Sequence, residues 1–252
     1  MKERIMTVDL EPDLQAEAPI QCKSMHTVIP KLLNFFDDQQ IKATFFVVTS
    51  LLEKYESEIK EIAQKHEIAS HSHTHHRLNP VNARWEMQKS KEVLKDHGIN
   101  VSGFRAPMFV TTKDHLALLR EVGYTYDSSL ARYLPTRYAN VTMPGKPFVR
   151  EKVLEFPVPN FVYPSINAGL PYLKSFHPLS RIFPRPYLFY LHPWEFLEKK
   201  DLPASQGMIP AFLTRNCGSK GREIFEKYIE RCGGTWIGCE EWMKRKNINE
   251  KI

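Results

Sequence analysis

The segment Ala43-Thr44-Phe45-Phe46-Val47-Val48 is followed by the charged amphipathic stretch 51–65 and then by the apolar pair Ile68-Ala69. The first run is aromatic and β-branched, which is typical of a buried strand. The stretch 51–65 has the apolar spacing of a helix, and residues 68–69 form a second short strand. We therefore predict a strand–helix–strand unit in which a crossover helix joins two parallel strands.

The same alternation extends through most of the chain. Further strands are expected at 5–8, 101–105, 124–126, 153–156, 187–191 and 235–239, and helices at 24–39, 82–97, 113–121 and 222–231. Residues 131–180 are rich in proline and aromatic side chains and are expected to form a loop-rich elaboration over one face of a barrel. The pattern predicts an α/β fold, and the length of 252 residues suits a single domain spanning 1–252.

Composition narrows the functional classes. Hydrophobic residues make up 42% and charged residues 25% of the chain, as in ordinary globular proteins. The net charge is +6, but the densest basic block is the short run Lys244-Arg245-Lys246. We therefore do not expect a nucleic-acid partner, and we keep peripheral contact with an anionic membrane surface as an alternative. Nothing in the sequence predicts the oligomeric state.

Cysteine usage and the N-terminal residues bear on the compartment. The four cysteines form no CxxC pair, so reduced thiols are expected rather than a zinc knuckle. The first nine residues lack the apolar core of a signal peptide. No apolar run approaches the ~20 residues that a membrane-spanning helix needs. These features favour a cytoplasmic location, with the inner membrane surface as the alternative.

The run His71-Ser72-His73-Thr74-His75-His76 follows the strand predicted at 68–69 and holds four histidines in six positions. Two imidazoles four residues apart, His71 and His75, can share one helical face and bind one ion. On that interpretation His73 and His76 face away from the ion. The alternative is an incidental histidine tract that merely retains metals.

Chemically capable side chains also follow several of the predicted strands. They are Asp9, His71, Arg105, Asp127 and His192. In parallel α/β folds, residues at the carboxyl ends of the strands converge at one edge of the sheet, where active sites lie. Each of these residues alone has an ordinary structural explanation, but all five together favour an active site.

Five short motifs in order resemble one known family. They are Thr7-Val8-Asp9-Leu10-Glu11, His71-Ser72-His73-Thr74-His75, Arg105-Ala106-Pro107, Asp127-Ser128-Ser129 and Leu191-His192-Pro193. This order resembles the polysaccharide deacetylases, carbohydrate esterase family 4. The resemblance covers about residues 4 to 240 and implies the NodB-homology fold, an irregular (β/α)7 barrel.

The resemblance implies a metal centre. His71 and His75 would bind one divalent ion, most often Zn²⁺ with Co²⁺ or Ni²⁺ as alternatives, and an acidic residue would be the third ligand. The family's usual first motif has two adjacent aspartates, whereas here Asp9 is followed by a leucine. Because residues two apart in a strand share a face, we favour Glu11 as the third ligand, with Asp13 as the alternative.

The resemblance also implies catalytic roles. Asp9 would be the general base that deprotonates water, and Arg105 would pair with Asp9 and keep it ionised. His192 would be the general acid that protonates the leaving amine. Asp127 would hold His192 and raise its pKa, because a nearby negative charge favours the imidazolium.

Substrate contacts follow from the same motifs. Leu191 would line a small pocket for the acyl methyl group. The backbone N–H of Met108, directly after Pro107, would help to bind the oxyanion. These residues complete the site that the resemblance implies.

The implied activity is metal-dependent hydrolysis of an N-acetyl or N-formyl amide on an amino sugar or polysaccharide. A lipid- or nucleotide-linked amino sugar is a possible form of the substrate if the protein is cytoplasmic. One alternative is hydrolysis of a cyclic imide or ureide on the same fold. Another is an inactive carbohydrate-binding relative. Relatives with the first activity tend to change the histidine and acid motifs, and inactive relatives usually lose the base or a metal histidine, whereas Asp9, His71 and His75 are all present here.

Overall fold

The computed structural model of the chain describes residues 2–15, 22–131, 144–162, 166–203 and 211–248. Its centre is a nine-stranded sheet with the order β10-β1-β2-β3-β4-β5-β7-β6, and β11 pairs with β1. The strands of this sheet are β1 (Glu3–Leu10), β2 (Ala43–Val47), β3 (Glu67–Ser70), β4 (Gly103–Phe104), β5 (Tyr126–Asp127), β6 (Phe148–Arg150), β7 (Val153–Glu155), β10 (Leu188–Leu191) and β11 (Thr235–Ile237). From β10 to β7 every neighbouring pair is parallel, which confirms the predicted α/β class.

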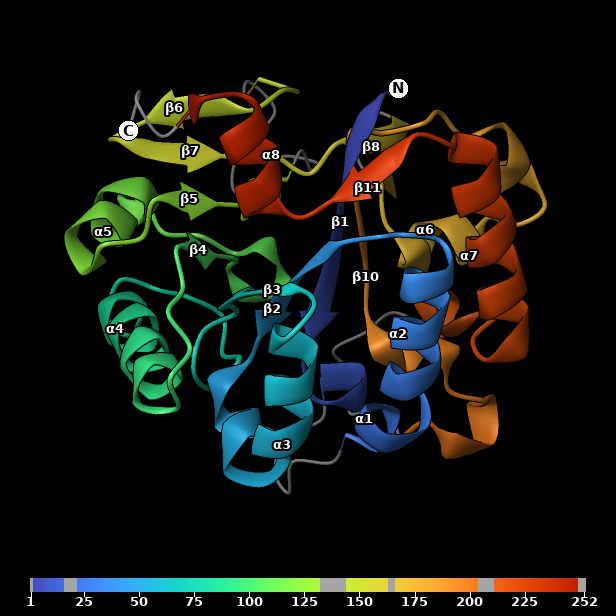
Figure 1. Cartoon of the computed structure of the whole chain (residues 1–252), viewed down its shortest axis with the longest axis horizontal. Helices are drawn as coiled ribbons and strands as arrows, with labels where there is room; N and C mark the ends of the chain where they lie inside the picture. Colours follow the sequence, from blue (N-terminus) through green and yellow to red (C-terminus); the bar gives the residue numbers. More distant parts are fainter. Residues whose placement is uncertain (1, 16–21, 132–143, 163–165, 204–210, 249–252) are drawn as a thin grey trace.

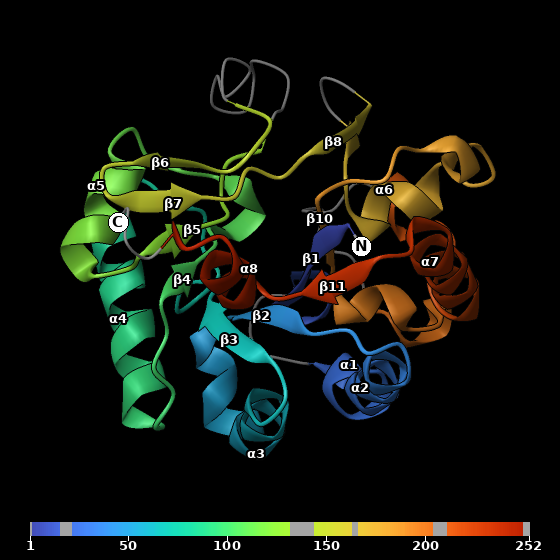
Figure 2. The same cartoon turned by 45° about the horizontal axis from the view of Figure 1, so that its top comes forward.

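Helices connect these strands and cover the outer face of the sheet, except the last helix, whose Cys239 and Met243 join the apolar cluster on the inner face. They are α1 (Lys23–Thr27), α2 (Ile29–Asp38), α3 (Leu52–Ala63), α4 (Ala83–Asp96), α5 (His115–Val122), α6 (Leu170–Ser175), α7 (Ser219–Cys232) and α8 (Cys239–Arg245). Figure 1 shows the helices arranged around the central strands, and Figure 2 shows the sheet curling as an open barrel. The curled sheet agrees with the expected seven-stranded NodB-type barrel.

Two apolar cores lie on the two faces of the sheet, and β1 shows how the sequence alternates between them. Met6, Val8 and Leu10 belong to the larger cluster between sheet and helices, whereas Ile5 belongs to the smaller cluster inside the barrel. Side chains on a strand point alternately to its two faces. Asp9 therefore shares the interior face with Ile5.

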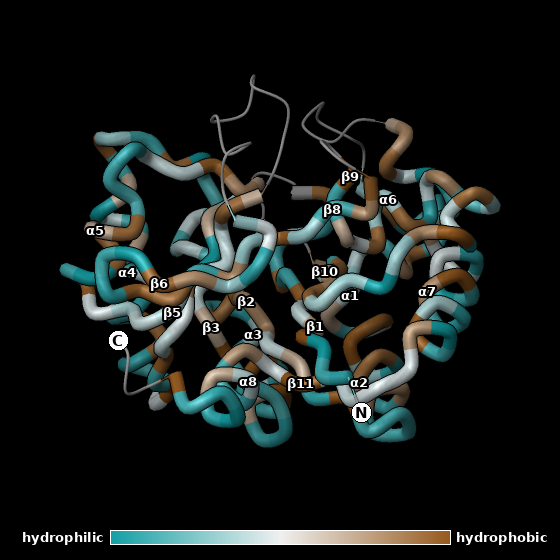
Figure 3. Tube along the Cα trace, turned by 90° about the horizontal axis from the view of Figure 1, so that it is seen from above, coloured by the Kyte–Doolittle hydropathy of each residue, from teal (hydrophilic) through white to brown (hydrophobic). Residues whose placement is uncertain are grey.

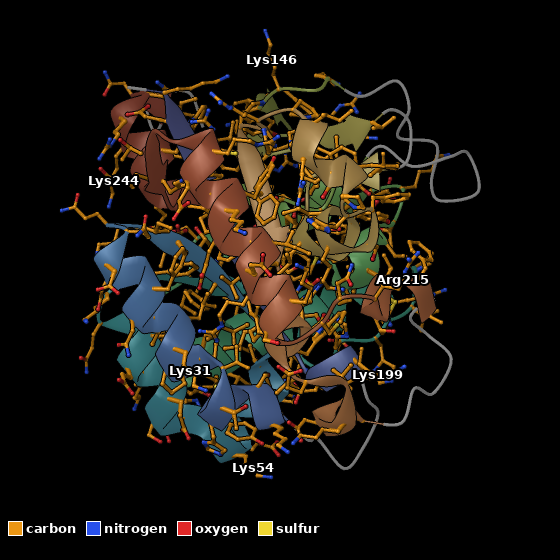
Figure 4. All side chains as sticks on the ribbon, turned by 90° about the vertical axis from the view of Figure 1, so that its right-hand side faces the viewer. Lys31, Lys54, Lys146, Lys199, Arg215 and Lys244 are labelled. Carbon is orange, nitrogen blue, oxygen red and sulfur yellow. The ribbon has the colours of Figure 1, made fainter. Side chains whose placement is uncertain are left out.

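The helices bury one apolar stripe each. On α2 the buried residues are Ile29, Leu32, Leu33 and Phe36, which recur at helical spacing. Figure 3 shows hydrophobic and hydrophilic positions alternating along α7. In Figure 4 the labelled cations Lys31, Lys54, Lys146, Lys199, Arg215 and Lys244 are spread over one side of the molecule. Within the described ranges, no helix is long and apolar enough to cross a membrane.

The structure corrects two local predictions. The helix expected at 24–39 is interrupted at Val28, and α2 begins again with Pro30 in its first turn, where a proline needs no hydrogen-bonding N–H. The segment His71–His76 is not helical, and Ser72 and His75 have left-handed φ angles of 68° and 65°. His71 and His75 therefore do not share a helical face.

The region expected to be loop-rich, 131–180, contains more regular structure than predicted. In its described part it holds β6, β7, a second small sheet of β8 (Asn160–Val162) with β9 (Ile166–Asn167), and α6. Residues 132–143 and 163–165 of this region lie outside the described ranges. The four cysteines are free thiols.

Gly103 in β4 lies against the ring of Tyr126 in the barrel interior. A Cβ atom added there would overlap the ring of Tyr126 on the neighbouring strand. We expect Gly103→Ala to lower the free energy of unfolding by about 1–3 kcal/mol, because overpacking a filled core displaces its neighbours. Urea unfolding checks this, with Ser102→Ala on the adjacent, half-exposed residue as the control. Equal stability of both variants would contradict the tight packing.

Candidate active site

Strand register decides which side chains reach the barrel interior at the carboxyl ends of the strands. Three residues lie in register on β3, β4 and β5: Ser70, Phe104 and Asp127. Residues paired in parallel strands face the same side of the sheet, and Phe104 belongs to the outer core. The next residues along the chain, His71, Arg105 and Ser128, therefore face the interior.

Glu11, His71 and His75 form a buried cluster at this end of the barrel. Nε2 of His75 lies 2.7 Å and Nε2 of His71 lies 3.7 Å from Oε2 of Glu11. One ligand atom from each of the three residues lies within 4.8 Å of the others. Two imidazoles and one carboxylate are the donor set of many catalytic zinc sites.

Hydrogen bonds around the cluster fit a metal ion. Nδ1 of His71 donates to the carbonyl oxygen of Arg105 at 2.8 Å, which leaves the lone pair of Nε2 facing Glu11. Nε2 of His75 is buried and makes no hydrogen bond with acceptable angles, although it lies 2.7 Å from the Glu11 carboxylate. Nε1 of Trp194 donates to the other oxygen, Oε1 of Glu11, at 3.1 Å. The donor atoms thus converge on one point and remain available to an ion.

Electrostatics keeps Glu11 ionised in this buried position. Burial by itself would raise the pKa of Glu11, but the neighbouring His75, His192 and His71 outweigh burial and hold its pKa well below the ordinary value. A charged carboxylate is the form that a metal ligand requires.

Asp13, the alternative third ligand, lies elsewhere. Its carboxylate accepts hydrogen bonds from the backbone N–H of Ser24 at 3.1 Å and from the Ser24 hydroxyl at 2.5 Å. Sγ of Cys22 lies 3.8 Å from the same carboxylate. Asp13 thus anchors the first turn of α1 and is not part of the histidine cluster.

Asp9 and Arg105 form a buried ion pair beside the cluster. Nη1 of Arg105 lies 2.5 Å from Oδ1 of Asp9, and the Arg105 side chain is fully buried. Arg105 also donates to the hydroxyl of Thr7 at 3.0 Å and to the carbonyl and hydroxyl oxygens of Ser128 at 3.1 and 2.8 Å. Because Arg105 occupies Oδ1, the other oxygen of Asp9 faces the site.

His192 follows β10 and faces the same space. Its Nε2 lies 3.8 Å from Oδ2 of Asp9 and 3.8 Å from Oε1 of Glu11. Its Nδ1 and its backbone N–H each donate to Oε1 of Glu195 at 3.0 Å. Burial lowers the pKa of His192, but Glu11, Glu195 and Asp9 outweigh burial and raise the pKa to about 9. His192 therefore carries its proton at neutral pH.

A lysine that the sequence analysis did not single out supports Glu195. Nζ of Lys174, on α6, lies 3.5 Å from Oε2 of Glu195, and both side chains are fully buried. Lys174 also donates to the carbonyl oxygens of Leu213 and Arg215. The chain of contacts His192–Glu195–Lys174 fixes the orientation of the imidazole.

The expectation that Asp127 holds His192 is corrected by the structure. Asp127 is in register with the outward-facing Phe104, so its carboxylate points toward α5. There Oδ2 lies 3.0 Å from Nε2 of His115, and Oδ1 accepts from the Ser129 hydroxyl at 2.5 Å. Because successive residues of a strand face opposite sides, Ser128 rather than Asp127 reaches the interior.

The expected substrate contacts have mixed outcomes. Leu191 is fully buried in the outer core with Val8, its register partner, so its side chain packs against helices rather than lining the site. Met108 follows Pro107 in a turn beyond Arg105 and has a left-handed φ of 54°. Its Sδ accepts a hydrogen bond from Nε of Arg77, which ties this turn to the segment that follows the histidine run.

Three contributors to the site were missed: Glu195, Lys174 and Trp194. The spacing of His192 and Glu195 matches the capping box of a helix start, and the structure shows that box at the 3₁₀ helix Pro193–Phe196. That spacing could have identified Glu195 as the partner of His192. Trp194 stacks on the His192 ring at a centroid distance of 5.2 Å. No local pattern marks Lys174, because its contacts come from distant parts of the chain.

Sequence comparison identifies a related family and a relative. Residues 5–126 match the family model of polysaccharide deacetylases. A peptidoglycan deacetylase of Helicobacter pylori is 31% identical over 107 residues, which cover 40% of this chain and 36% of that protein. The chain thus aligns with little more than a third of this relative.

Solved structures share the fold. A protein of Mycobacterium smegmatis assigned to the polysaccharide deacetylases matches with a TM-score of 0.62 at 19% identity, over 99% of this chain and 92% of its own. The Bc1960 peptidoglycan N-acetylglucosamine deacetylase matches with a TM-score of 0.53 at 16% identity, over 95% and 86% of the two chains. A CE4 family pseudoenzyme from Bacillus anthracis matches with a TM-score of 0.55 at 12% identity, over 95% and 65%. The resemblance inferred from the motifs is confirmed.

The cluster geometry predicts which acid binds the metal. We expect Glu11→Gln to lower the affinity for zinc by about tenfold or more, because the amide removes the negative charge from the donor set. Asp13→Asn is the matched control and should retain zinc, although it weakens the anchor of α1. Metal analysis after reconstitution with Zn²⁺ measures both. Zinc retained by Glu11→Gln and lost from Asp13→Asn would assign the third ligand to Asp13.

Proposed function

We propose that this chain, whose residues 5–126 match the family model of polysaccharide deacetylases, hydrolyses the N-acetyl or N-formyl amide of an amino sugar. The observation that carries the proposal is the convergence of two different groups on one space. Oδ2 of Asp9 and Nε2 of His192 lie 3.8 Å apart, beside the cluster of Glu11, His71 and His75.

The cluster is the proposed holder of one divalent ion, for which zinc is the leading candidate. When bound, such an ion lowers the pKa of a water molecule and polarises the carbonyl of the scissile amide. Glu11, His71 and His75 supply three donors, which is the number found in catalytic sites that keep one position open. The hydrogen bonds of His71 and Trp194 hold two of these donors in orientation.

Asp9 is the proposed general base. Arg105 binds its Oδ1 and leaves Oδ2 free to accept the proton of the attacking water. Nη1 of Arg105 lies 2.5 Å from Oδ1 of Asp9 and holds the carboxylate in this orientation. Arg105 thereby positions the base without contacting the reacting atoms.

His192 is the proposed general acid. Its pKa of about 9 keeps the imidazole protonated at neutral pH, as donation of a proton to the leaving amine requires. Glu195 fixes Nδ1, so the proton on Nε2 faces Asp9 and the site. The base and the acid are thus each oriented by a neighbour, Asp9 by Arg105 and His192 by Glu195.

The backbone N–H of Met108 is proposed to stabilise the oxyanion. The left-handed φ of Met108 places it in a turn beyond Arg105, at the end of the barrel where the other candidate residues gather. A backbone donor in a rigid turn stabilises developing charge without reorganisation.

Asp9→Asn tests the proposed chemistry directly. We expect kcat for acetate release to fall by about 10²–10⁴, because the amide cannot accept the proton of water. Zinc content should stay near that of the wild type, since Asp9 is outside the donor cluster. The assay uses the zinc-loaded protein with N-acetylated and N-formylated amino sugars, chitooligosaccharides and peptidoglycan fragments. Full turnover by Asp9→Asn, or no release of acetate or formate by the wild type, would refute the proposal.

Glu195→Gln tests the assignment of the acid. Removing the carboxylate charge lowers the pKa of His192, so the imidazolium is lost at lower pH. We expect the alkaline limb of the kcat/KM profile to move down by about one pH unit. Asp127→Asn is the matched control and should leave that limb in place, because Asp127 contacts His115 instead. The reverse outcome would return the role to Asp127.

A further inference from the structure

Trp85 is an exposed aromatic residue whose ring contacts His73, in the segment that carries His71 and His75. It lies in the first turn of α4 and is 52% exposed. Among the large exposed hydrophobic side chains of the described ranges, only Trp85 and Phe212 are aromatic. Burial of a tryptophan side chain is favourable, so a half-exposed indole can gain binding energy when a ligand covers it.

The indole packs against the segment that carries the metal ligands. The rings of Trp85 and His73 meet edge to face, with centroids 5.5 Å apart and planes inclined by 76°. His73 lies midway between His71 and His75 in the sequence. Nδ1 of His73 lies 2.9 Å from the hydroxyl of Thr49, which holds the ring in place. Trp85 therefore contacts the segment 71–76 through the ring of His73.

Glu86, the neighbour of Trp85 on α4, fixes this arrangement. Its buried carboxylate accepts hydrogen bonds from the backbone N–H groups of His73 and Thr74 at 2.8 and 2.9 Å, and from the Thr74 hydroxyl. The start of α4 is thus tied to the main chain of the metal segment. Trp85 consequently has a fixed position relative to His71 and His75.

The chemistry of this surface suits an uncharged sugar ring. The C–H face of a pyranose is apolar and slightly positive, and it complements the negative face of an indole. The hydroxyl groups at the edge of the same ring can remain hydrated.

We propose that Trp85, supported by His73, is a stacking platform for a second sugar ring of an oligosaccharide whose N-acylated unit occupies the metal centre. This inference rests on the proposed function and narrows its substrate to chains of two or more sugars. Trp85 would act on binding of the longer substrate and not on the chemical step.

Kinetics with substrates of increasing length test the platform. We expect Trp85→Ala to raise KM for N-acetylated chitooligosaccharides or peptidoglycan fragments by about three- to tenfold, the effect of one aromatic contact, with kcat unchanged. KM for the single N-acetylated sugar should not change. Trp85→Phe should restore most of the affinity, because it keeps an aromatic face. Phe212→Ala, which removes the other half-exposed aromatic ring, is the matched control.

A binding measurement separates this proposal from the proposed function. Calorimetric titration of the zinc-loaded protein with the same oligosaccharides measures binding affinity even if no acetate is released. Weaker binding by Trp85→Ala alone supports the platform whether or not the protein is a deacetylase. The proposal is wrong if wild type and Trp85→Ala bind the oligosaccharides equally well, or if Trp85→Ala loses the same affinity for single sugars as for oligosaccharides. It is also wrong if the wild type binds no oligosaccharide.

Discussion

The buried ion pair of Arg105 with Asp9 is the constraint on which the carboxyl end of the barrel depends. Breaking a buried pair leaves an unpaired charge and costs about 3–5 kcal/mol. Thr7 and Ser128 complete the hydrogen bonds of the guanidinium, whose carbon lies 4.1 Å from the centroid of the Phe46 ring. The pair therefore joins β1 to the strand ends on the opposite part of the curled sheet, and it sets the space in which Glu11 and His192 meet.

The face of the sheet that a site residue occupies can be predicted from the sequence when its strand is long. Apolar and polar residues alternate over residues 6–10 of the eight-residue strand β1, so Asp9 and Glu11, two positions apart, could be assigned to one face from the sequence. The two-residue strand β5 carries no such pattern, so nothing in the sequence showed that Asp127 faces α5. Likewise, the spacing of His71 and His75 suggested a helix, whereas two left-handed residues bring the same imidazoles together in a loop.

Charge balance explains how so many ionisable groups remain buried together. Asp9, Glu11 and Glu195 supply negative charge, and Arg105, Lys174 and His192 oppose it. Lys174 and Glu195 are both fully buried, and each would be costly without the other. Local sequence patterns do not predict such long-range pairs, because Lys174 lies on α6 and Glu195 lies after β10.

The hydrogen bonds from Glu86 to the main chain of the metal segment have a consequence for which positions can be substituted. Glu86 binds backbone N–H groups of residues 73 and 74, so it holds the fold of the loop whatever side chain occupies position 73. The ligands His71 and His75 are thereby insulated from changes at positions 73 and 85. On the proposed function, substitutions at these two positions would change the contacts to a sugar chain while His71 and His75 kept their places.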